Sequence, residues 1–239
     1  ESKANKWILS LEEKESHYLK RVLRLRKGDV IAVIDGIGHL WEATVQVDDS
    51  IQLSSPFDSP LQEQSRPNPL IGLAVVLPKR GFDELLRMSC EIGVDFIQPL
   101  RSDRGIVRMD GEGRSLRWKG IIREAVEQSE RLWCPELRRI IDVKDWLGAK
   151  HSKVDYAFAS TRMLKPIDFQ SWIMRLNEGI DQVWVAIGPE GGWTPNEQVL
   201  AKESGCIEVQ IGDSIMRTST AAVSASQLMV SWRRNTSLC

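Results

Sequence analysis

From residue 70 onward, hydrophobic positions follow two spacings in alternation, one typical of strands and one typical of helices. Apolar runs predict buried strands at 70–77, 94–100, 154–159 and 183–187, and alternating apolar residues predict a strand at 206–211. Stripes at helical spacing predict helices at 82–92, 115–131 and 166–177. The inward stripe of the second helix would consist of Leu116, Ile121, Ile122, Ala125 and Val126. This alternation is typical of an α/β fold, in which a mostly parallel sheet carries helices on both faces.

The first 55 residues have a different pattern, with short apolar runs separated by turn residues. Runs at 29–35 and 40–47 flank a Gly-Ile-Gly turn and predict a β-hairpin in a small, mostly β domain. Residues 20–26 are predicted to form a short helix that turns its arginines outward. Its inward stripe would consist of Leu19, Val22, Leu23 and Leu25.

The segment 54–69 differs from both regions, because it holds four of the ten prolines and few apolar residues. Proline-rich polar segments are typical of linkers between domains. The sequence therefore predicts a boundary at the end of this segment, with one domain at 1–69 and a second at 70–239.

Two loops in the last third of the chain follow predicted strands directly. The first is Gly188-Pro189-Glu190-Gly191-Gly192, and the second begins at Gly212. Between them a helix is predicted to start at Pro195, since Thr194 and Glu197 match a capping box and Gly205 follows the helix end. After the second loop, a helix is predicted near Ala221, with cap hydroxyls offered by Thr218, Ser219 and Thr220.

Parallel strands end on one edge of their sheet, so both loops are expected there, beside Ser160 and Thr161 at the end of strand 154–159. A lone Gly-Gly pair more often serves only a tight turn, but two successive loops of this kind favour a binding site. Neither loop fits the Walker or G-x-G-x-x-G pattern, and Glu190 would repel a phosphate. A neutral or cationic small molecule is therefore the favoured ligand.

Basic residues are concentrated in two stretches, although the formal net charge is only -1. The first stretch holds Lys20, Arg21, Arg24, Arg26 and Lys27. The second holds Arg101, Arg104, Arg108, Arg114, Arg117, Lys119 and Arg123. Most charge runs are only solvated surfaces, and for the first stretch a solvated helix and a nucleic-acid contact are equally supported. Together the two stretches favour a polyanionic partner.

Composition narrows the class of protein. With 42% hydrophobic and 27% charged residues, the chain resembles an ordinary globular protein, and no apolar run reaches the ~20 residues of a membrane helix. The polar N-terminus predicts no signal peptide. The four cysteines are Cys90, Cys134, Cys206 and Cys239. They form no C-x-x-C pair and no metal-ligand spacing with a histidine, which predicts reduced thiols, no metal and a cytoplasmic location.

Three motifs resemble those of the RsmE-type methyltransferases: IGPEGG at 187–192, IGDSIMRTSTA at 211–221 and EAVEQSER at 124–131. The stretches HYLKRVLRLRKGD at 17–29 and EIGVDFIQPL at 91–100 are also similar, so the resemblance covers nearly the whole chain. Members of this family use S-adenosylmethionine to methylate N3 of one uridine in 16S ribosomal RNA. The resemblance implies a C-terminal SPOUT-type α/β domain with a trefoil knot, preceded by a small PUA-like β-barrel, in a homodimer whose interface completes the site.

Carried over by position, the resemblance predicts the cofactor site, whereas the residues expected to contact RNA are taken from the first basic stretch. The substrate would be 16S ribosomal RNA or the assembled small subunit, contacted by Lys20, Arg21, Arg24 and Arg26. S-adenosylmethionine would be bound by Ala159, Ser160, Thr161, Ile187, Gly188, Pro189, Glu190, Gly192, Ile211, Gly212, Ile215, Met216, Thr218 and Ala221.

One position departs from the family pattern, because Ser219 stands where an acid is common. No loop carboxylate is therefore expected to act as a base. Arg217 is the candidate catalytic residue, since its guanidinium stays charged and can contact two acceptors; a structural ion pair at a dimer interface is an equally supported role. Two other functions remain open: a catalytically weak RNA-binding or ribosome-assembly protein, and a knotted methyltransferase that acts on transfer RNA.

Overall fold

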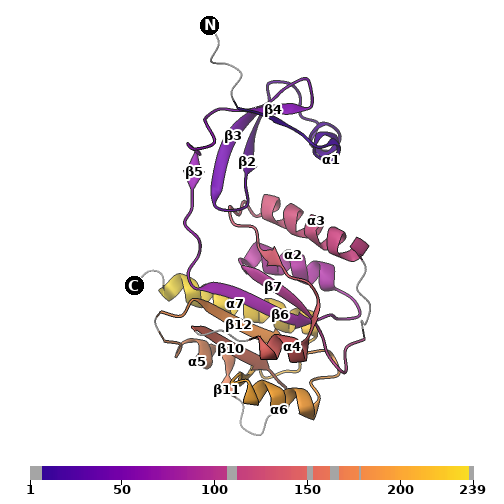
Figure 1. Ribbon diagram of the computed structural model, residues 1–239, viewed down its shortest axis with the longest axis vertical. Helices are drawn as coiled ribbons and strands as arrows, with labels where there is room; N and C mark the ends of the chain where they lie inside the picture. The colour runs from indigo at the N-terminus through magenta and orange to yellow at the C-terminus, as the bar shows by residue number, and fades with distance from the viewer. Residues whose placement is uncertain (1–6, 107–111, 150–152, 162–166, 178, 237–239) are drawn as a thin grey trace. The chain divides into compact units, whose positions relative to one another are not determined.

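The computed structural model describes residues 7–106, 112–149, 153–161, 167–177 and 179–236. The chain forms two compact units, Glu1–Arg66 and Pro67–Cys239 (Figure 1). Parts of the sequence interpretation that concern Arg108, His151, Pro166 or Cys239 lie outside the described residues.

The first unit is an antiparallel sheet with one short helical segment. Its elements are β1 (Ile8–Ser10), α1 (Glu13–His17), the π-helical turn η1 (Tyr18–Val22), β2 (Val30–Ile34), β3 (His39–Val45), β4 (Ser50–Leu53) and β5 (Gln62–Glu63). The strand order is β1-β4-β3-β2, and β5 pairs with β3. Alternate residues of β3, Trp41, Ala43 and Val45, face the core of this unit together with Ile51 and Leu53. The predicted hairpin is confirmed as β2 and β3.

The helix predicted at 20–26 is wrong in position. Helical backbone runs instead from Glu13 to Val22, and Arg24 has a left-handed backbone conformation with φ of 58°. Val22 and Leu23 are 59% and 48% exposed, so they do not form the predicted inward stripe. The π-helical turn explains the error, because it changes the spacing on which a helical stripe depends. The predicted linker also needs correction, since Gln62–Glu63 within it forms strand β5 of the first unit.

The second unit alternates strands and helices around one parallel sheet. Its elements are β6 (Leu70–Val76), α2 (Phe82–Ile92), β7 (Phe96–Arg101), α3 (Glu112–Gln128), β8 (Glu136–Leu137), β9 (Ile141–Asp142), α4 (Val143–Gly148), β10 (Val154–Ala159), β11 (Ile167–Asp168), α5 (Phe169–Ile173), β12 (Gln182–Ile187), α6 (Pro195–Glu203), β13 (Ile207–Gln210) and α7 (Thr218–Thr236). The strand order is β11-β13-β10-β12-β6-β7-β8, with β9 on β7, and every pairing is parallel. The predicted parallel α/β fold is confirmed.

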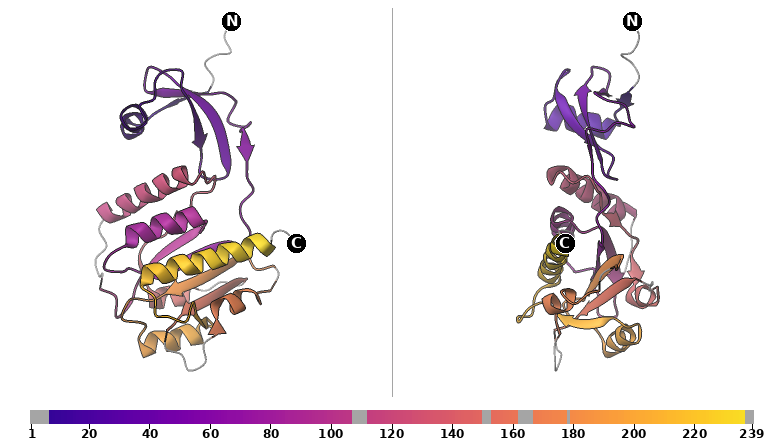
Figure 2. Two further views of the ribbon diagram at one scale, coloured as in Figure 1. Left: turned by 180° about the vertical axis from the view of Figure 1, so that it is seen from behind. Right: turned by 90° about the vertical axis from the view of Figure 1, so that its left-hand side faces the viewer.

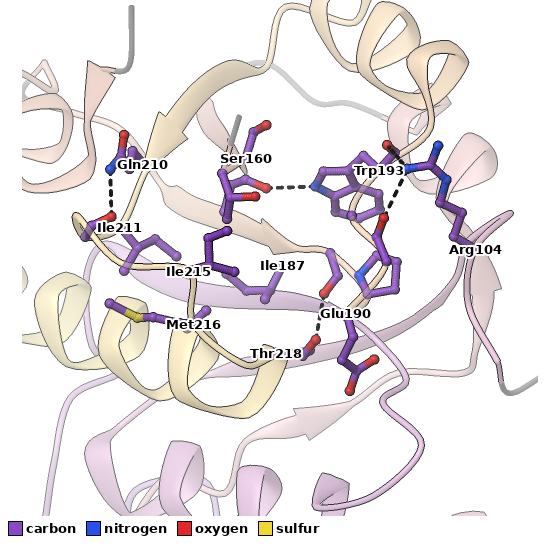
Figure 3. A pocket seen from close by; sticks show the side chains of 18 of the residues that line it. Arg104, Ser160, Ile187, Glu190, Trp193, Gln210, Ile211, Ile215, Met216 and Thr218 are labelled. Atoms are coloured by element: carbon purple, nitrogen blue, oxygen red, sulfur yellow. Dashed lines mark hydrogen bonds between the residues drawn. The ribbon is translucent and has the colours of Figure 1, made fainter. Parts of the chain in front are cut away.

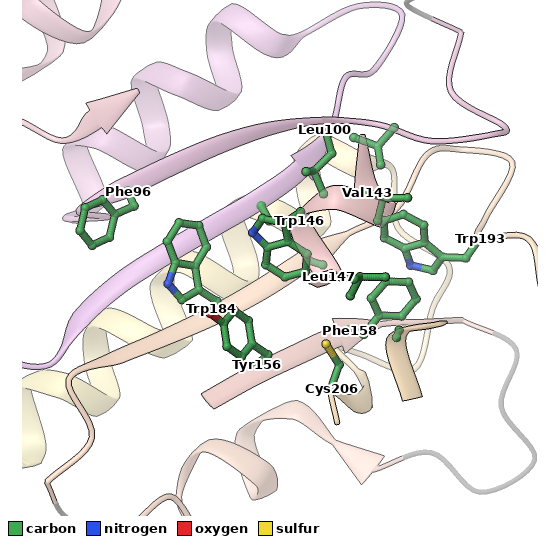
Figure 4. Close-up of a cluster of buried hydrophobic side chains, with 14 residues drawn as sticks. Phe96, Leu100, Val143, Trp146, Leu147, Tyr156, Phe158, Trp184, Trp193 and Cys206 are labelled. Atoms are coloured by element: carbon green, nitrogen blue, oxygen red, sulfur yellow. The ribbon is translucent and has the colours of Figure 1, made fainter. Parts of the chain in front are cut away.

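Helices cover both faces of this sheet, which explains why its central strands are apolar throughout. Helices α2, α3, α5 and α7 pack together on one face, and α4 and α6 on the other (Figure 2). Strand β12 lies between β6 and β10, so residues 183–187 are buried on both sides. Under α4 and α6 the core is rich in aromatic rings, among them Phe96, Trp146, Trp184 and Trp193 (Figure 4).

Three helix predictions need correction in detail. In α3, Leu116 is 71% exposed, whereas Trp118 is 5% exposed and packs on Phe82 of α2 with ring centroids 4.5 Å apart. The predicted burial of Ile122, Ala125 and Val126 is confirmed, and Trp118 takes the inward place that was predicted for Leu116. Helix α5 is shorter than predicted, because Ile167–Asp168 pairs with β13 as a strand before the helix begins. Helix α7 starts at Thr218, so the three hydroxyl residues lie in its first turn and do not precede it.

Candidate functional site

The carboxyl ends of β10, β12 and β13 meet at one edge of the sheet and surround a pocket (Figure 3). Every residue predicted to bind a cofactor lines this pocket. The residues come from three loops, at 159–161, 187–193 and 210–218, and the first turn of α7 completes the wall. Strands that are far apart in the sequence are adjacent here, which is why the loops converge.

Two glycines determine the path of the loop after β12. A Cβ added to Gly188 would lie 2.9 Å from the Trp193 ring, closer than side chains approach one another, so the indole can pack there only against a glycine. Gly192 has a φ of 70°, which glycine adopts without strain, and its amide donates to the Pro189 carbonyl oxygen at 2.9 Å. The loop therefore forms a compact turn whose backbone faces the pocket.

Trp193 connects this loop to the end of β10. Its indole Nε1 donates to the Ala159 carbonyl oxygen at 2.8 Å, and its ring stacks on Phe158 with centroids 4.3 Å apart. The ring is buried on the sheet, as Figure 4 shows. A buried tryptophan with a satisfied N–H is a rigid spacer, so the first two loops keep a constant separation.

Thr218 connects the third loop to the second. Its Oγ1 donates to the Gly188 carbonyl oxygen at 2.9 Å, so the hydroxyl predicted to cap a helix bridges two loops instead. The third loop is further held by Gln210, whose Nε2 donates to the Gly212 carbonyl oxygen at 2.7 Å. All three loops are thus joined by hydrogen bonds across the pocket.

The start of α6 brings a fourth loop, which follows β7, to the pocket. The predicted capping box of Thr194 and Glu197 is confirmed, and Pro195 is the first helical residue. Glu197 is fully buried, and its carboxylate also accepts a hydrogen bond from the Asp103 amide at 3.0 Å. The next residue, Arg104, donates from Nη1 to the carbonyl oxygens of Gly191 and Trp193 at 3.0 and 3.2 Å.

Sequence reasoning missed several lining residues: Arg104, Gly191, Trp193, Gln198, Gln210 and Ser214. Gly191 and Ser214 lie within the motifs, and extending each motif by one residue would have found Trp193 and Gln210. Arg104 was not predicted to line the pocket, because its place in a basic stretch suggested contact with a polyanion. In the structure its guanidinium holds the carbonyl groups of the glycine loop.

The pocket lining is mainly apolar side chains and backbone. Ile187, Ile211, Ile215 and Met216 cluster on one side, and the exposed carboxylate of Glu190 points away from them in Figure 3. Among the described residues of the lining, Arg104 alone is cationic, and its guanidinium is engaged with carbonyl groups. Such a lining suits an organic ligand with an apolar ring and groups that hydrogen-bond to backbone, and it does not suit a phosphate.

The candidate catalytic residue lies beside the pocket without lining it. Arg217 is exposed, follows Met216 and precedes Thr218, both of which line the pocket. Among the described residues, its side chain has no hydrogen-bond or ion-pair partner. An exposed guanidinium without an internal partner can contact a substrate or a second chain.

The predicted RNA-contacting residues belong to the first unit and differ in their surroundings. Lys20 forms an ion pair with Asp49, and hydrogen bonds from Lys20 and Ser16 hold the pKa of the Asp49 carboxyl below its ordinary value. Arg21 is exposed within the π-helical turn, and Arg24 and Arg26 are exposed on the segment that follows it. Three of the four predicted side chains therefore present their charge to solvent.

Within the described ranges, no group of three or more histidine, cysteine, aspartate or glutamate side chains is arranged to hold a metal ion. None of the helices that the structure describes combines the length and the apolarity needed to cross a membrane.

Comparisons with known proteins agree with this architecture. A family model described as an RNA methyltransferase domain matches residues 65–230, and one described as an RNA methyltransferase PUA domain matches residues 11–54. The ribosomal RNA small subunit methyltransferase E of Synechocystis sp. is 34% identical over 89% of this chain and 69% of its own length. The corresponding protein of Rickettsia conorii is 28% identical over 87% of this chain and 83% of its own length.

A solved structure extends the similarity to three dimensions. It is the crystal structure of a ribosomal RNA small subunit methyltransferase E from Neisseria gonorrhoeae bound to S-adenosyl methionine. The identity is 29%, the TM-score is 0.78, and the match covers 93% of this chain and 90% of that one. Given the family model over 65–230 and the relative with 34% identity, this chain belongs to the RsmE-type family of RNA methyltransferases.

Proposed function

We propose that this protein transfers a methyl group from S-adenosylmethionine to N3 of a specific uridine in 16S ribosomal RNA. The observation that carries the proposal is the convergence of three loops on one pocket, two of which carry family motifs, in a chain whose relatives are named as small-subunit ribosomal RNA methyltransferases. A similar structure holds S-adenosyl methionine. The family membership and the chemistry of the pocket support the same activity.

The pocket residues fit this cofactor. When bound, S-adenosylmethionine supplies a methyl group activated by a positively charged sulfur. Ile187, Ile215 and Met216 would pack against its apolar parts, and the backbone of the glycine loop would hydrogen-bond to its polar groups. S-adenosylmethionine carries a positive sulfur and no phosphate, so the pocket needs no free basic side chain to bind it. This agrees with Arg104, whose guanidinium already donates hydrogen bonds to carbonyl groups.

The substrate nitrogen sets the remaining chemical requirement. N3 of uracil carries a proton at neutral pH, so this proton must pass to solvent water or hydroxide for the nitrogen to accept a methyl group. The negative charge then spreads onto the two neighbouring carbonyl oxygens, where a cation or hydrogen-bond donors stabilise it. Arg217 is the proposed residue for this task, since it is exposed beside the pocket and its guanidinium can donate to two acceptors.

The finer architecture is part of the proposal. The second unit would be a SPOUT-type domain with a trefoil knot, and the first would close into a PUA-like barrel. We further infer functional domains at 1–69 and 70–239, a homodimer that completes the site, and a cytoplasmic location. The match of a PUA-domain model to residues 11–54 supports the assignment of the first unit.

A methyl-transfer assay tests the activity. Unmodified small ribosomal subunits and 16S transcript are incubated with the protein and labelled S-adenosylmethionine, and the RNA is then mapped by mass spectrometry. A single new methyl group on N3 of one uridine is expected. Methylation of transfer RNA instead would show that 16S ribosomal RNA is not the substrate. RNA binding without any methylation would favour an assembly factor, a function that Ser219 in place of the usual acid makes worth testing.

A further inference from the structure

A second pocket of the C-terminal unit lies at the start of α2 and is lined by charged residues. It is formed by the loop after β6, the first turn of α2 and one side of α3, which packs along α2 (Figure 1). The residues that carry its chemistry are Lys79, Arg80, Asp83, Glu84, Arg114 and Arg117. We refer to it as the basic pocket.

The two carboxylates of the basic pocket are already neutralised within the protein. Asp83 forms an ion pair with Arg117, and Glu84 forms one with Arg87. Lys79 and Arg80 are exposed, and neither has a hydrogen-bond or ion-pair partner among the described residues. The charge that this pocket offers to solvent is therefore positive.

Backbone groups add to this positive potential. Helix α2 begins after Gly81, and no side chain caps its first turn. The free N–H groups of a helix N-terminus favour anions, so they act in the same direction as Lys79 and Arg80. The rings of Phe82 and Trp118 pack against each other beneath the pocket, which gives the charged groups a rigid floor.

The sheet topology places the basic pocket on the same edge as the cofactor pocket. Strand β6 runs parallel to β12 and beside it, with Val75 opposite Ile187. The loop with Lys79 and Arg80 follows β6, and the glycine loop of the cofactor pocket follows β12. The two loops therefore follow neighbouring strands at the same edge of the sheet.

We propose that the basic pocket binds backbone phosphates of the RNA substrate, through Lys79, Arg80 and the first turn of α2. The inference rests on the proposed function, because it requires that the ligand at this edge is RNA. Phosphate contacts carry no sequence information, but they set the orientation of a bound nucleic acid. The pocket would thus position the RNA chain while the target base is held next to the cofactor.

The test is the salt dependence of RNA binding by the full chain. Unmodified small subunits and 16S transcript serve as probes, and the variant is Lys79→Ala with Arg80→Ala. Each lost single-strand phosphate contact removes ~0.7 from the logarithmic salt slope, so the variant slope should be smaller by about 1.4. The ratio of wild-type to variant RNA affinity would then increase about 25-fold as the salt concentration falls from 1 M to 0.1 M. Affinity for S-adenosylmethionine should not change.

Two matched variants separate a phosphate site from a general charge effect. Arg175→Ala with Lys202→Ala removes the same charge from other exposed positions and should leave the slope unchanged. Lys79→Arg with Arg80→Lys keeps the charge and should retain the wild-type slope.

A wild-type slope in the Lys79 and Arg80 alanine variant, with normal RNA binding by the wild type, overturns this inference alone. A reduced slope in a protein that never methylates the RNA overturns the proposed function and leaves the phosphate site standing. A wild-type protein that binds neither probe overturns both.

Discussion

At the scale of single residues, the proposed cofactor pocket depends on two positions that have no side chain. Gly188 permits the Trp193 ring to pack against the backbone, and Gly192 adopts a left-handed conformation. The two glycines act through different causes, since the first avoids a clash and the second avoids backbone strain. Nothing lies within 4 Å of a Cβ built on Gly192, so its effect comes from the backbone alone.

Gly192→Val should weaken S-adenosylmethionine binding about tenfold or more. A β-branched residue held in the left-handed region costs roughly 1–3 kcal/mol, and relief of that strain would move the loop away from the pocket. Isothermal calorimetry measures the change. The control is Gly28→Val, which imposes similar strain at a φ of 94° in the first unit and should not affect the cofactor. Equal affinity of Gly192→Val and wild type would show that the loop does not contact the ligand.

Arg217→Lys should lower kcat by about 10²-fold, with little change in cofactor affinity, because the charge remains but the two-pronged donor is lost. With Ser219 in place of the usual acid, we predict that no loop carboxylate acts as a base, so the rate of the wild type and of the variant should rise with pH toward the pKa of the imide itself. Single-turnover rates across pH test both statements. Full kcat in a dimeric, cofactor-binding variant would exclude Arg217 from the mechanism. A flat profile would reveal another base.

At the scale of elements, the start of α6 joins two loops that are distant in the sequence. Glu197 accepts hydrogen bonds from the amide and the hydroxyl of Thr194, at 2.7 and 3.0 Å, and from the Asp103 amide at 3.0 Å. A buried carboxylate is stable here because all of these donors face it. One helix cap therefore also positions the loop that carries Arg104.

Glu197→Gln should lower the free energy of unfolding by about 2 kcal/mol. The amide group of glutamine would point its N–H toward a backbone N–H, and one charge-assisted hydrogen bond would be lost. Urea denaturation measures the loss. Glu203→Gln, on the exposed end of the same helix, should change stability by less than ~0.5 kcal/mol. If both variants unfold at the same urea concentration as wild type, the carboxylate does not connect the two loops.

At the scale of the whole molecule, the two units carry separate parts of the expected activity. The cofactor pocket belongs entirely to the second unit, whereas the exposed arginines Arg21, Arg24 and Arg26 belong to the first. Binding of a polyanion and binding of the cofactor should therefore respond to different substitutions.

Replacing Arg21, Arg24 and Arg26 with glutamate should weaken RNA binding and reduce its salt slope by about 2, with cofactor affinity unchanged. The physical reason is the loss of three phosphate contacts, each of which releases bound counterions. Filter binding over a salt series is the measurement. The charge-preserving replacement of all three with lysine should keep the slope. An unaltered slope in the glutamate variant would identify these side chains as an ordinary solvated surface.

Local patterns were sufficient for the central strands, the cap of α6 and the glycine loops. Residues 183–187 are apolar because both faces of β12 are covered, and a capping box requires only Thr194 and Glu197, three positions apart. Interactions of this range leave a readable spacing in the sequence. The same reasoning misplaced the first helix, since a π-helical turn breaks that spacing.

Only the tertiary structure decided how these pieces form a site. Sheet order placed β12 between β6 and β10, and it brought Arg104 to Gly191 and Trp193 to Ala159. Thr218 became a bridge between loops where its sequence context predicted a cap. These contacts join residues that lie tens of positions apart, and no local spacing encodes them. The sequence by itself determined which loops could bind a ligand, and the packing of the sheet determined which side chains hold those loops together.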